Sequence, residues 1–282
     1  MSESRLPSAS IENEFLRLEY LTTTGPRIIG LYAKGVEGNL FAETPKVHWA
    51  TPLGEFYLRG GHRLWTAPEN PQFIGPEDGL SVIEDNGVTL KGAVDASGLE
   101  KEIAIRLDGN QVHLSHRVSW HGDKPLVLAP WTITQLRLGG MGILPLSANT
   151  GGLVPNRNLV LWPYSQIHDE RLDLHDDMIL LHGKAAEQAM KIGNRNTHGW
   201  IAYALGDALF VKRFEVVDGN FPDLGCNVEA YVWDSCLELE MLGALVTLKK
   251  NESVMLNESW EVLAGEFPAN AETARIIGGR LQ

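Results

Sequence analysis

Apolar and polar residues alternate with a period of two along most of this chain, which is the pattern of β-strands with one buried face. Residues 103–107 alternate in this way, the turn sequence Asp108-Gly109-Asn110 follows, and the alternation resumes over residues 112–120. Two alternating runs joined by a glycine-containing turn are typical of a β-hairpin. The chain closes on the same pattern, because residues 246–248 and 254–262 flank a polar turn. We therefore expect a second hairpin at this end.

Signals for helices are few. Residues 185–192 are compatible with a two-turn helix, and Asn270 can cap a short helix that ends at Ile277. The polar run over residues 168–177 indicates a long loop. Because strands outnumber helices and do not alternate with them, a βαβ arrangement is excluded. We predict an all-β fold, a large antiparallel β-sandwich with few short helices, which forms a single domain over residues 1–282.

The composition excludes several classes of protein. With 44% hydrophobic residues the chain can build a large core, which excludes global disorder. No apolar run approaches the length of about 18 residues that a membrane-spanning helix needs, and the first residues lack a secretory signal pattern. The net charge of −12 argues against nucleic acid or an anionic membrane surface as a partner. Cys226 and Cys236 are too few for a disulfide framework, so we expect a cytoplasmic protein with reduced cysteines.

Motifs for common cofactors are missing from the sequence, which contains no P-loop, dinucleotide fingerprint, GxSxG or CxxC. Histidines and acidic residues gather between residues 168 and 182, but their spacing matches neither HExxH nor an EF-hand loop. We therefore expect no cofactor and no metal site. The oligomeric state is left open.

The stretch most suggestive of a binding site runs from Arg59 to Glu69 and reads RGGHRLWTAPE. Its two glycines, which allow a close backbone approach, precede His62, Arg63 and Trp65. A tryptophan beside an arginine and a glutamate suits a sugar, because the indole covers the apolar face of the ring while the charged groups bind its hydroxyls. An edge turn with an Arg–Glu ion pair and a core tryptophan explains the same residues equally well.

A second candidate stretch covers residues 236–243. If it is a strand, Glu238 and Glu240 project to one face while the apolar residues beside them face the core. Neighbouring carboxylates raise each other's pKa, as general acid–base catalysis requires, although a solvated strand face is the interpretation that this stretch alone favours. Just upstream, Glu229 lies in another alternating stretch, and its side chain can face the same side as this pair. Lys212 lies inside an apolar run, so its charge needs either a carboxylate or a ligand beside it. A structural ion pair with a carboxylate is the favoured alternative.

Three stretches near the N-terminus, residues 11–14, 25–29 and 38–43, resemble the first strands of the galactose mutarotase-like (aldose epimerase-like) superfamily. The GGHRLWTAPE stretch resembles the sequences of a bacterial branch of that superfamily. Residues 237–245 are similar to the segment in which sugar epimerases keep their catalytic glutamate. The resemblance covers most of the chain through short motifs. It implies a large antiparallel β-supersandwich with a sugar lying in a groove across one sheet.

In aldose epimerases a glutamate takes the proton from the anomeric hydroxyl while a histidine protonates the ring oxygen, so that the ring opens and closes again as the other anomer. By its position in the motif, Glu240 matches the base. The histidine is missing, because residues 128–134 read LAPWTIT where epimerases have an Asn-His pair before an aromatic strand. His62 or Lys212 would have to act as the acid, or the protein does not epimerise.

The resemblance leaves two main functions open, with a small-molecule carbohydrate as the partner in both. The first is an epimerase that acts at the anomeric carbon of an aldose or a hexose phosphate. The second is a saccharide-binding module without catalysis, and an accessory domain of carbohydrate metabolism is a weaker third. A usable acid favours catalysis, whereas its loss favours binding alone. The predicted site residues are, as catalytic groups, Glu240 and His62 and, as substrate-binding groups, Arg63, Trp65, Glu69, Trp131, Lys212 and Glu229.

Overall fold

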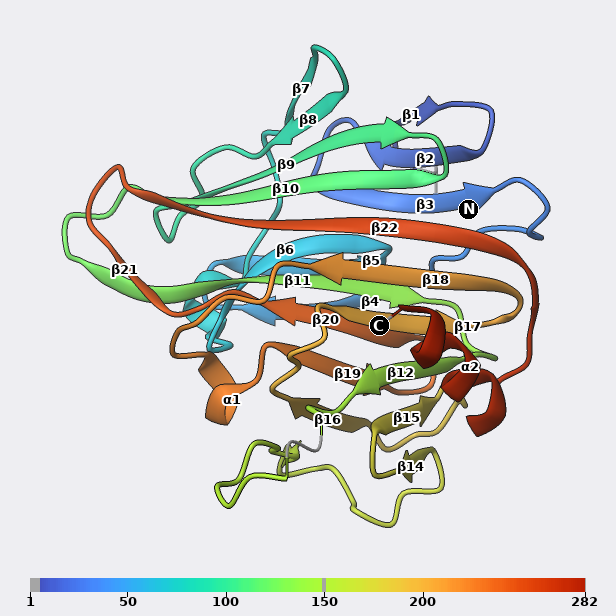
Figure 1. Cartoon of the computed structure of the whole chain (residues 1–282). Helices are drawn as coiled ribbons and strands as arrows, with labels where there is room; N and C mark the ends of the chain where they lie inside the picture. The colour runs from blue at the N-terminus through green and yellow to red at the C-terminus, as the bar shows by residue number, and fades with distance from the viewer. Residues whose placement is uncertain (1–5, 149–150, 282) are drawn as a thin grey trace.

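The computed structural model describes residues 6–148 and 151–281, which form two ten-stranded sheets and a separate hairpin (Figure 1). Neighbouring strands pair antiparallel. The first sheet contains, in spatial order, β1 (Ser8–Glu12), β2 (Leu16–Leu21), β3 (Arg27–Ala33), β6 (His62–Ala67), β11 (Leu126–Leu136), β20 (Leu237–Leu242), β19 (Val228–Val232), β16 (Met190–Asn194) and β13 (Val160–Leu161), and β21 (Val246–Leu248) pairs with β11. The hairpin consists of β4 (Glu43–Thr51) and β5 (Gly54–Gly60).

The second sheet lies against the first. It contains, in spatial order, β14 (Leu172–Leu174), β15 (Met178–His182), β12 (Met141–Pro145), β17 (Trp200–Ala204), β18 (Gly206–Phe214), β22 (Ser253–Phe267), β10 (Gln111–Trp120), β9 (Leu99–Asp108), β8 (Val88–Lys91) and β7 (Ser81–Glu84). The helical elements of the described residues are the short η1 (Pro71–Phe73) and α1 (Pro222–Gly225) and the longer α2 (Ala271–Leu281).

The core lies between the two sheets, because each strand turns its apolar residues inward. In β10, Val112, Leu114 and Val118 are buried, while the alternate residues keep some exposure. From other parts of the chain, the rings of Phe41 and Trp260 meet edge to face, with centroids 5.6 Å apart. The predicted all-β sandwich with few helices is confirmed.

The two predicted hairpins have different outcomes. β9 and β10 pair along their full length around the turn at residues 109–110, as the alternation predicts. At the other end of the chain the expected pairing is wrong: β21 hydrogen-bonds to β11 of the first sheet, whereas β22 lies between β10 and β18 in the second. The turn is present, but it carries the chain from one sheet to the other.

Of the two helix predictions, the one at the C-terminus is confirmed and the other is wrong. Asn270 caps α2 by accepting a hydrogen bond from the backbone N–H of Thr273 at 2.9 Å, and the helix runs beyond Ile277 to Leu281. α2 packs its buried residues on the outer face of the second sheet. The helix expected over residues 185–192 is wrong, because Met190 and Ile192 enter strand β16, which pairs with β19.

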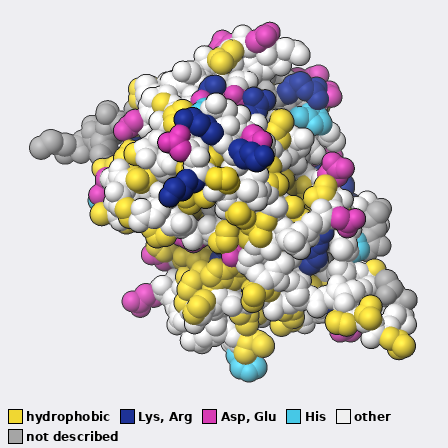
Figure 2. All heavy atoms as spheres, turned by 90° about the vertical axis from the view of Figure 1, so that its left-hand side faces the viewer, with side chains coloured by type: hydrophobic (Ala, Val, Ile, Leu, Met, Phe, Trp, Pro, Cys, Tyr) yellow, Lys and Arg dark blue, Asp and Glu magenta, His cyan; other side chains and the backbone are white. Residues whose placement is uncertain are grey.

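The predicted loop over residues 168–177 is mostly irregular and contains only the three-residue β14. No helix of the described residues is long and apolar enough to cross a membrane. Figure 2 shows the face at the left-hand end of Figure 1, where hydrophobic side chains gather in the middle and lower part and Lys and Arg side chains mostly above them.

The hairpin β4–β5 covers part of the outer face of the first sheet. Phe56 and Leu58 from the hairpin are buried against Trp65, Trp131 and neighbouring residues of β6, β11 and β20. This contact forms a small apolar cluster outside the main core. The cluster forms one wall of the cavity described next.

Candidate functional site

A cavity of about 490 Å³ opens on the outer face of the first sheet, between the hairpin β4–β5 and strands β6, β11, β20, β19 and β16. Six aromatic side chains and four charged ones contribute to its wall. These are Trp49, Trp65, Trp131, Tyr164, Tyr231 and Trp233, together with Arg63, Glu69, Lys191 and Glu238. Large apolar ring faces with a few converging polar groups are the usual composition of a small-molecule site.

The strand register explains why these residues meet. Because side chains alternate between the two faces of a strand, Arg63 points outward from β6 while His62 points into the sandwich. Ile133 lies opposite both Arg63 and Glu240, and Glu240 lies opposite Glu229 in β19. Arg63, Glu240 and Glu229 therefore lie in one row across four adjacent strands, with Ile133 between the arginine and the two glutamates.

Lys191 lines the cavity and pairs with both glutamates of this row. Its ammonium group lies 2.7 Å from Glu229 Oε2 and 2.9 Å from Glu240 Oε2. It also lies over the ring of Trp131, 4.6 Å from the ring centroid, while Trp131 Nε1 donates to Glu240 Oε2 at 2.7 Å. Burial would lower the pKa of Lys191, but the two carboxylates outweigh it and raise that pKa well above its usual range.

Glu229 pairs with the same ammonium group and is fully buried. Its burial raises its pKa well above the usual range for a carboxyl group, against the opposing effect of Lys191 and with a further upward contribution from Glu240. One ammonium group thus serves two carboxyl groups. Burial beside a second carboxyl group therefore favours the neutral form of Glu229.

Arg63 forms the second charged centre of the cavity. Its Nη2 lies 3.3 Å from Glu238 Oε1, which also accepts a hydrogen bond from Gln135 Nε2 at 2.7 Å. The guanidinium stacks over the Trp65 ring at 4.5 Å. Its Nε and Nη1 atoms are buried and lack a hydrogen-bond partner within the described chain. Because buried donors without partners are costly, these two atoms are suited to oxygen atoms of a ligand.

Glu69 stands at the mouth of the cavity, two residues after the end of β6. Desolvation raises its pKa, and Lys191 partly offsets that rise. No ion pair to its carboxyl group is present among the described residues, and Arg63, the partner that an edge-turn interpretation would give it, pairs with Glu238 instead. Glu69 is therefore a carboxyl group with a raised pKa at the cavity edge.

The structure gathers most of the predicted site residues and separates two of them. Arg63, Trp65, Glu69 and Trp131 line the cavity. Glu229 and Glu240 lie directly behind its wall, where both contact Lys191. His62 and Lys212 are fully buried between the two sheets. A side chain on that inner face does not reach the cavity, so His62 and Lys212 both lie outside the candidate site.

His62 and Lys212 belong to a hydrogen-bond chain in the core. His116 Nδ1 donates to the Leu256 carbonyl at 3.0 Å, so its Nε2 accepts from His62 Nε2 at 2.8 Å. His62 Nδ1 then accepts from Thr134 Oγ1 at 2.9 Å, and this oxygen in turn accepts from Lys212 Nζ at 2.9 Å. Every member is satisfied when both imidazoles are neutral.

Glu258 closes this core network. It accepts from Trp260 Nε1 at 2.8 Å and from Thr132 Oγ1 at 2.9 Å, and Lys212 Nζ lies 3.4 Å from it. The ligand-type atoms of His62, His116 and Glu258 come within 4.8 Å of one another, as in a metal site. Because the ammonium of Lys212 already supplies the positive charge beside the carboxylate, the network accounts for these groups without an ion.

The two core histidines are expected to make the protein sensitive to mild acid. Burial lowers the pKa of His62 and His116, so both stay neutral in the folded state, whereas in the unfolded chain they bind protons as the pH falls through about 6.5. Protonation thus favours unfolding. The wild type should lose stability relative to His116→Gln between pH 7.5 and 5.5 in urea denaturation.

This comparison isolates the histidines, because the carboxyl groups with raised pKa values act in the opposite direction in both proteins. Substitution of the exposed His168 by Gln is the matched control for loss of one imidazole. A difference between wild type and His116→Gln that stays constant with pH would contradict the prediction.

Lys191 is the main functional candidate that the sequence did not predict. It falls inside the stretch expected to be helical, and a helical register does not place it beside Glu240. The available signal was a cation between two apolar residues in Met190-Lys191-Ile192, the same signal that singled out Lys212. Among the aromatic wall residues that were not predicted, Trp49 and Tyr164 come from distant segments without a shared motif.

Comparison with known proteins bears on the fold. The sequence matches no family model and no curated protein. Slr1438 from Synechocystis sp. PCC 6803 has a similar structure, with a TM-score of 0.56 at 11% identity over 94% of this chain and 98% of that one. A galactose mutarotase-like protein from Lactobacillus casei ATCC 334 has a TM-score of 0.51 at 11% identity over 91% and 100% of the two chains.

A candidate aldose 1-epimerase from Escherichia coli K12 gives a similar result, with a TM-score of 0.53 at 12% identity over 92% of this chain and 99% of that one. At such identities the likeness concerns the backbone arrangement, and it extends over nearly the whole of each chain. The chain therefore has the galactose mutarotase-like fold.

Proposed function

We propose that the cavity binds an aldose and that the protein interconverts its anomers. The observation that carries this proposal is the wall of tryptophan and tyrosine rings beside the Arg63–Glu238 pair and the Lys191 cluster. Ring faces cover the apolar side of a sugar, while charged groups bind its hydroxyls. The fold shared with a galactose mutarotase-like protein and with a candidate aldose 1-epimerase supports the same substrate class.

Glu240 is the proposed base. Trp131 and Lys191 fix its Oε2 atom, and its Oε1 atom has no hydrogen-bond partner in the described chain. Glu240 takes the proton from the anomeric hydroxyl, and the C1–O5 bond breaks as the aldehyde forms. Glu69, whose pKa is raised, gives a proton to the ring oxygen. Rotation about C1–C2 and the reverse proton transfers yield the other anomer.

Exchange spectroscopy by NMR, with polarimetry as a second readout, tests this proposal. A panel of free aldoses and hexose phosphates is offered at neutral pH, and the rate of anomer interconversion is compared with the uncatalysed rate. At least one sugar is expected to show a protein-dependent rate. No acceleration across the panel would overturn catalysis.

A sugar-binding module without catalysis is the second candidate. It is favoured by the complete burial of Glu240 and by the two hydrogen bonds that already occupy one of its oxygens. Calorimetry with the same panel separates the two functions. Binding without interconversion supports the module, whereas binding with interconversion supports the enzyme.

Removal of Trp49 is expected to weaken sugar binding by about tenfold, because stacking area worth roughly 1.5 kcal/mol is lost. Trp49 lies on the hairpin, lines the cavity and is 38% exposed, so Trp49→Ala leaves the main core intact. Titration followed by calorimetry measures the change. Tyr57→Ala is the matched control, since Tyr57 is 40% exposed on the same hairpin and lies outside the cavity. Equal losses in the two variants would contradict a sugar in this cavity.

A further inference from the structure

The outer edge of β1 is the longest free strand edge among the described ends of the two large sheets. β1 and β13 end the first sheet, and β14 and β7 end the second. β1 contains five residues, whereas β7 contains four, β14 three and β13 two. Among the described strands β1 pairs with β2 alone, and this pairing runs without a bulge. The other side of β1 is therefore an unpaired strand edge (Figure 1).

The hydrogen bonds to β2 show which backbone groups point to this free edge. Thr22 donates its backbone N–H to the Pro7 carbonyl at 3.0 Å, and Asn13 donates to the Leu16 carbonyl at 2.9 Å. In an antiparallel pair, residues that bond to the neighbouring strand alternate with residues that do not. Every second residue from Pro7 to Asn13 therefore faces β2. The residues between them, whose N–H and C=O groups point to the free edge, are Ser8, Ser10 and Glu12.

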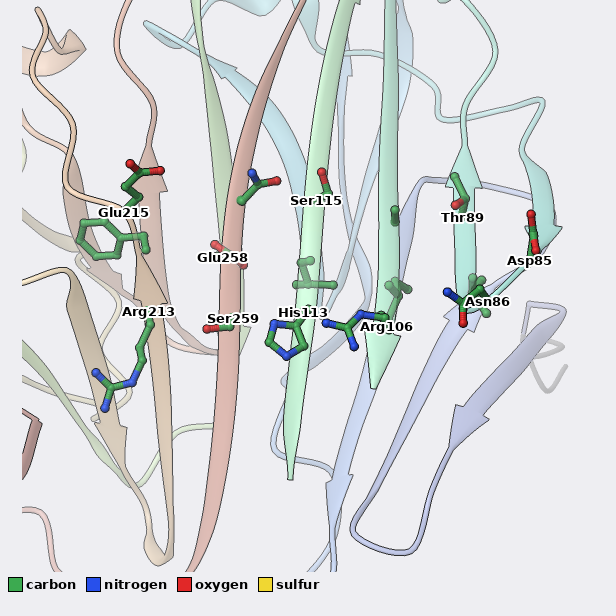
Figure 3. Close-up of a pocket in the computed structure, with 17 residues that line it drawn as sticks. Asp85, Asn86, Thr89, Arg106, His113, Ser115, Arg213, Glu215, Glu258 and Ser259 are labelled. Atoms are coloured by element: carbon green, nitrogen blue, oxygen red, sulfur yellow. The ribbon is translucent and has the colours of Figure 1, made fainter. Parts of the chain in front are cut away.

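The devices that usually block a strand edge are missing along β1. Lysine, proline and bulges are such devices, and residues 8–12 contain none of them. The edge of the second sheet differs, because two carboxylates, those of Glu84 and Asp85, stand at the end of β7. Figure 3 shows Asp85 at the outer end of that sheet, beside a pocket on its solvent-facing side. β1 has a single carboxylate, that of Glu12, which lies opposite Arg17 of β2.

The apolar core is incompletely covered at the same end of the sandwich. Ala9 and Ile11 of β1 pack against the main core but stay partly exposed, as does Val82 of β7. The two edges lie close together here, because Tyr20 in β2 donates a hydrogen bond to Glu84 in β7 at 3.4 Å. A strand added beside β1 extends the inner face of its sheet and removes this apolar surface from water.

The sequence Ser8-Ala9-Ser10-Ile11-Glu12 is complementary to itself in an antiparallel arrangement. A two-fold axis through Ser10, perpendicular to the sheet, places this residue opposite its own equivalent in a second copy. The flanking pairs are then Ala9 with Ile11 and Ser8 with Glu12. On the inner face a small residue lies opposite a large one, and on the outer face hydroxyls lie opposite hydroxyls or carboxylates. Such cross-strand pairs are favourable, and no like charges lie directly opposite each other.

The free backbone groups fit the same register. Ser10 of each copy donates its N–H to the Ser10 carbonyl of the other, and Ser8 and Glu12 exchange equivalent bonds on both sides of the axis. All five residues of each strand are then paired. Moving the axis by one residue leaves end residues of each strand without a partner in β1. This agreement between backbone and side chains favours a second copy over an unrelated strand.

We propose that two copies of this chain associate through β1, so that their first sheets form one continuous sheet. The interface is isologous, with its two-fold axis at Ser10. Because two five-residue strands make a small contact, the dimer is expected to dissociate on dilution. The contact lies at the end of the first sheet and shares no residue with the aromatic cavity. Dimer formation is therefore measured without any sugar.

Sedimentation velocity of the full chain over a concentration series tests this association. The wild type is expected to shift from monomer to dimer as its concentration rises. Ser10→Pro removes the N–H that each copy donates at the axis and leaves the bonds between β1 and β2 in place. The dissociation constant should therefore rise by about tenfold to a hundredfold, as expected for the loss of two hydrogen bonds.

Ser10→Ala is the matched control, because it keeps the backbone N–H and removes only the hydroxyl group. It should change the dissociation constant little, and thermal melts verify that both variants are folded. A wild type that stays monomeric over the whole series would overturn the proposal. Equal effects of Ser10→Pro and Ser10→Ala would also count against it, since the backbone pairing at Ser10 would then be absent.

Disulfide cross-linking tests the register independently. Directly opposite, hydrogen-bonded residues have Cα atoms about 5.5 Å apart, a separation that a disulfide spans. Ser10→Cys is therefore expected to form a covalent dimer when oxidised glutathione is added, as seen on a non-reducing gel. The native thiols of Cys226 and Cys236 are buried and do not compete.

Ser8→Cys is the control on the same edge. Across the proposed axis its two equivalents lie about 13 Å apart along the strand direction, too far for a disulfide. It should therefore stay monomeric under the same oxidation. Cross-linking of Ser8→Cys as fast as that of Ser10→Cys, or no cross-linking of Ser10→Cys, would contradict the proposed interface.

Discussion

Replacement of Lys212 by Met is expected to lower the free energy of unfolding by about 3–5 kcal/mol, the usual effect of removing one partner from a buried ion pair. Lys212 and Glu258 are both fully buried, 3.4 Å apart, between the two sheets. After the substitution Glu258 keeps its hydrogen bonds from Trp260 and Thr132, but no positive charge remains beside its carboxylate. Thr134 also loses the donor that orients the histidine chain.

Urea denaturation at pH 7.5 measures this change. Lys250→Met is the control, since Lys250 lies 2.7 Å from Asp123 in an exposed pair, and loss of a solvent-screened surface pair should change the free energy of unfolding little. The double variant Lys212→Met, Glu258→Gln should regain part of the stability, because no unpaired charge remains in the core. Similar losses for Lys212→Met and Lys250→Met would contradict a structural role for the core pair.

The fold was largely predictable because its main signal is local. Alternation with a period of two reports which face of a strand is buried, and the turn at residues 109–110 joins strands that are neighbours in both sequence and space. The partner of β21 was not predictable in this way. Its residues alternate as a hairpin strand would, but β21 pairs with β11, more than 100 residues away in the chain. Pairing over such distances depends on the packing of whole sheets.

The candidate site was predictable where one motif supplies several groups. The stretch from Arg59 to Glu69 brings Arg63 and Trp65 to the cavity because both alternate outward on β6. The same alternation turns His62 inward, so the motif contributes to the cavity and to the core network at once. Lys191 was missed because its segment has too few residues to distinguish a short strand from a helix.

Glu240→Gln is expected to lower the rate of anomer interconversion by roughly two to four orders of magnitude, the usual contribution of a general base. Glutamine has the shape of glutamate but cannot accept the proton. Its carbonyl oxygen can still accept from Trp131 and Lys191, as Glu240 Oε2 does, and Lys191 keeps its contact with Glu229 at 2.7 Å. The cavity should therefore keep its shape, and the affinity for sugar should change little.

Wild type and variant are compared by NMR exchange for rate and by calorimetry for affinity, on the sugar that the wild type converts fastest. Glu102→Gln is the control, because Glu102 pairs with Arg117 on the other sheet and does not contact the cavity. A lower rate with unchanged affinity, found for Glu240→Gln and not for Glu102→Gln, supports Glu240 as the base. Equal rates for wild type and Glu240→Gln would remove Glu240 from the mechanism and leave Glu238, the carboxylate that lines the cavity beside Arg63, as the base to test next.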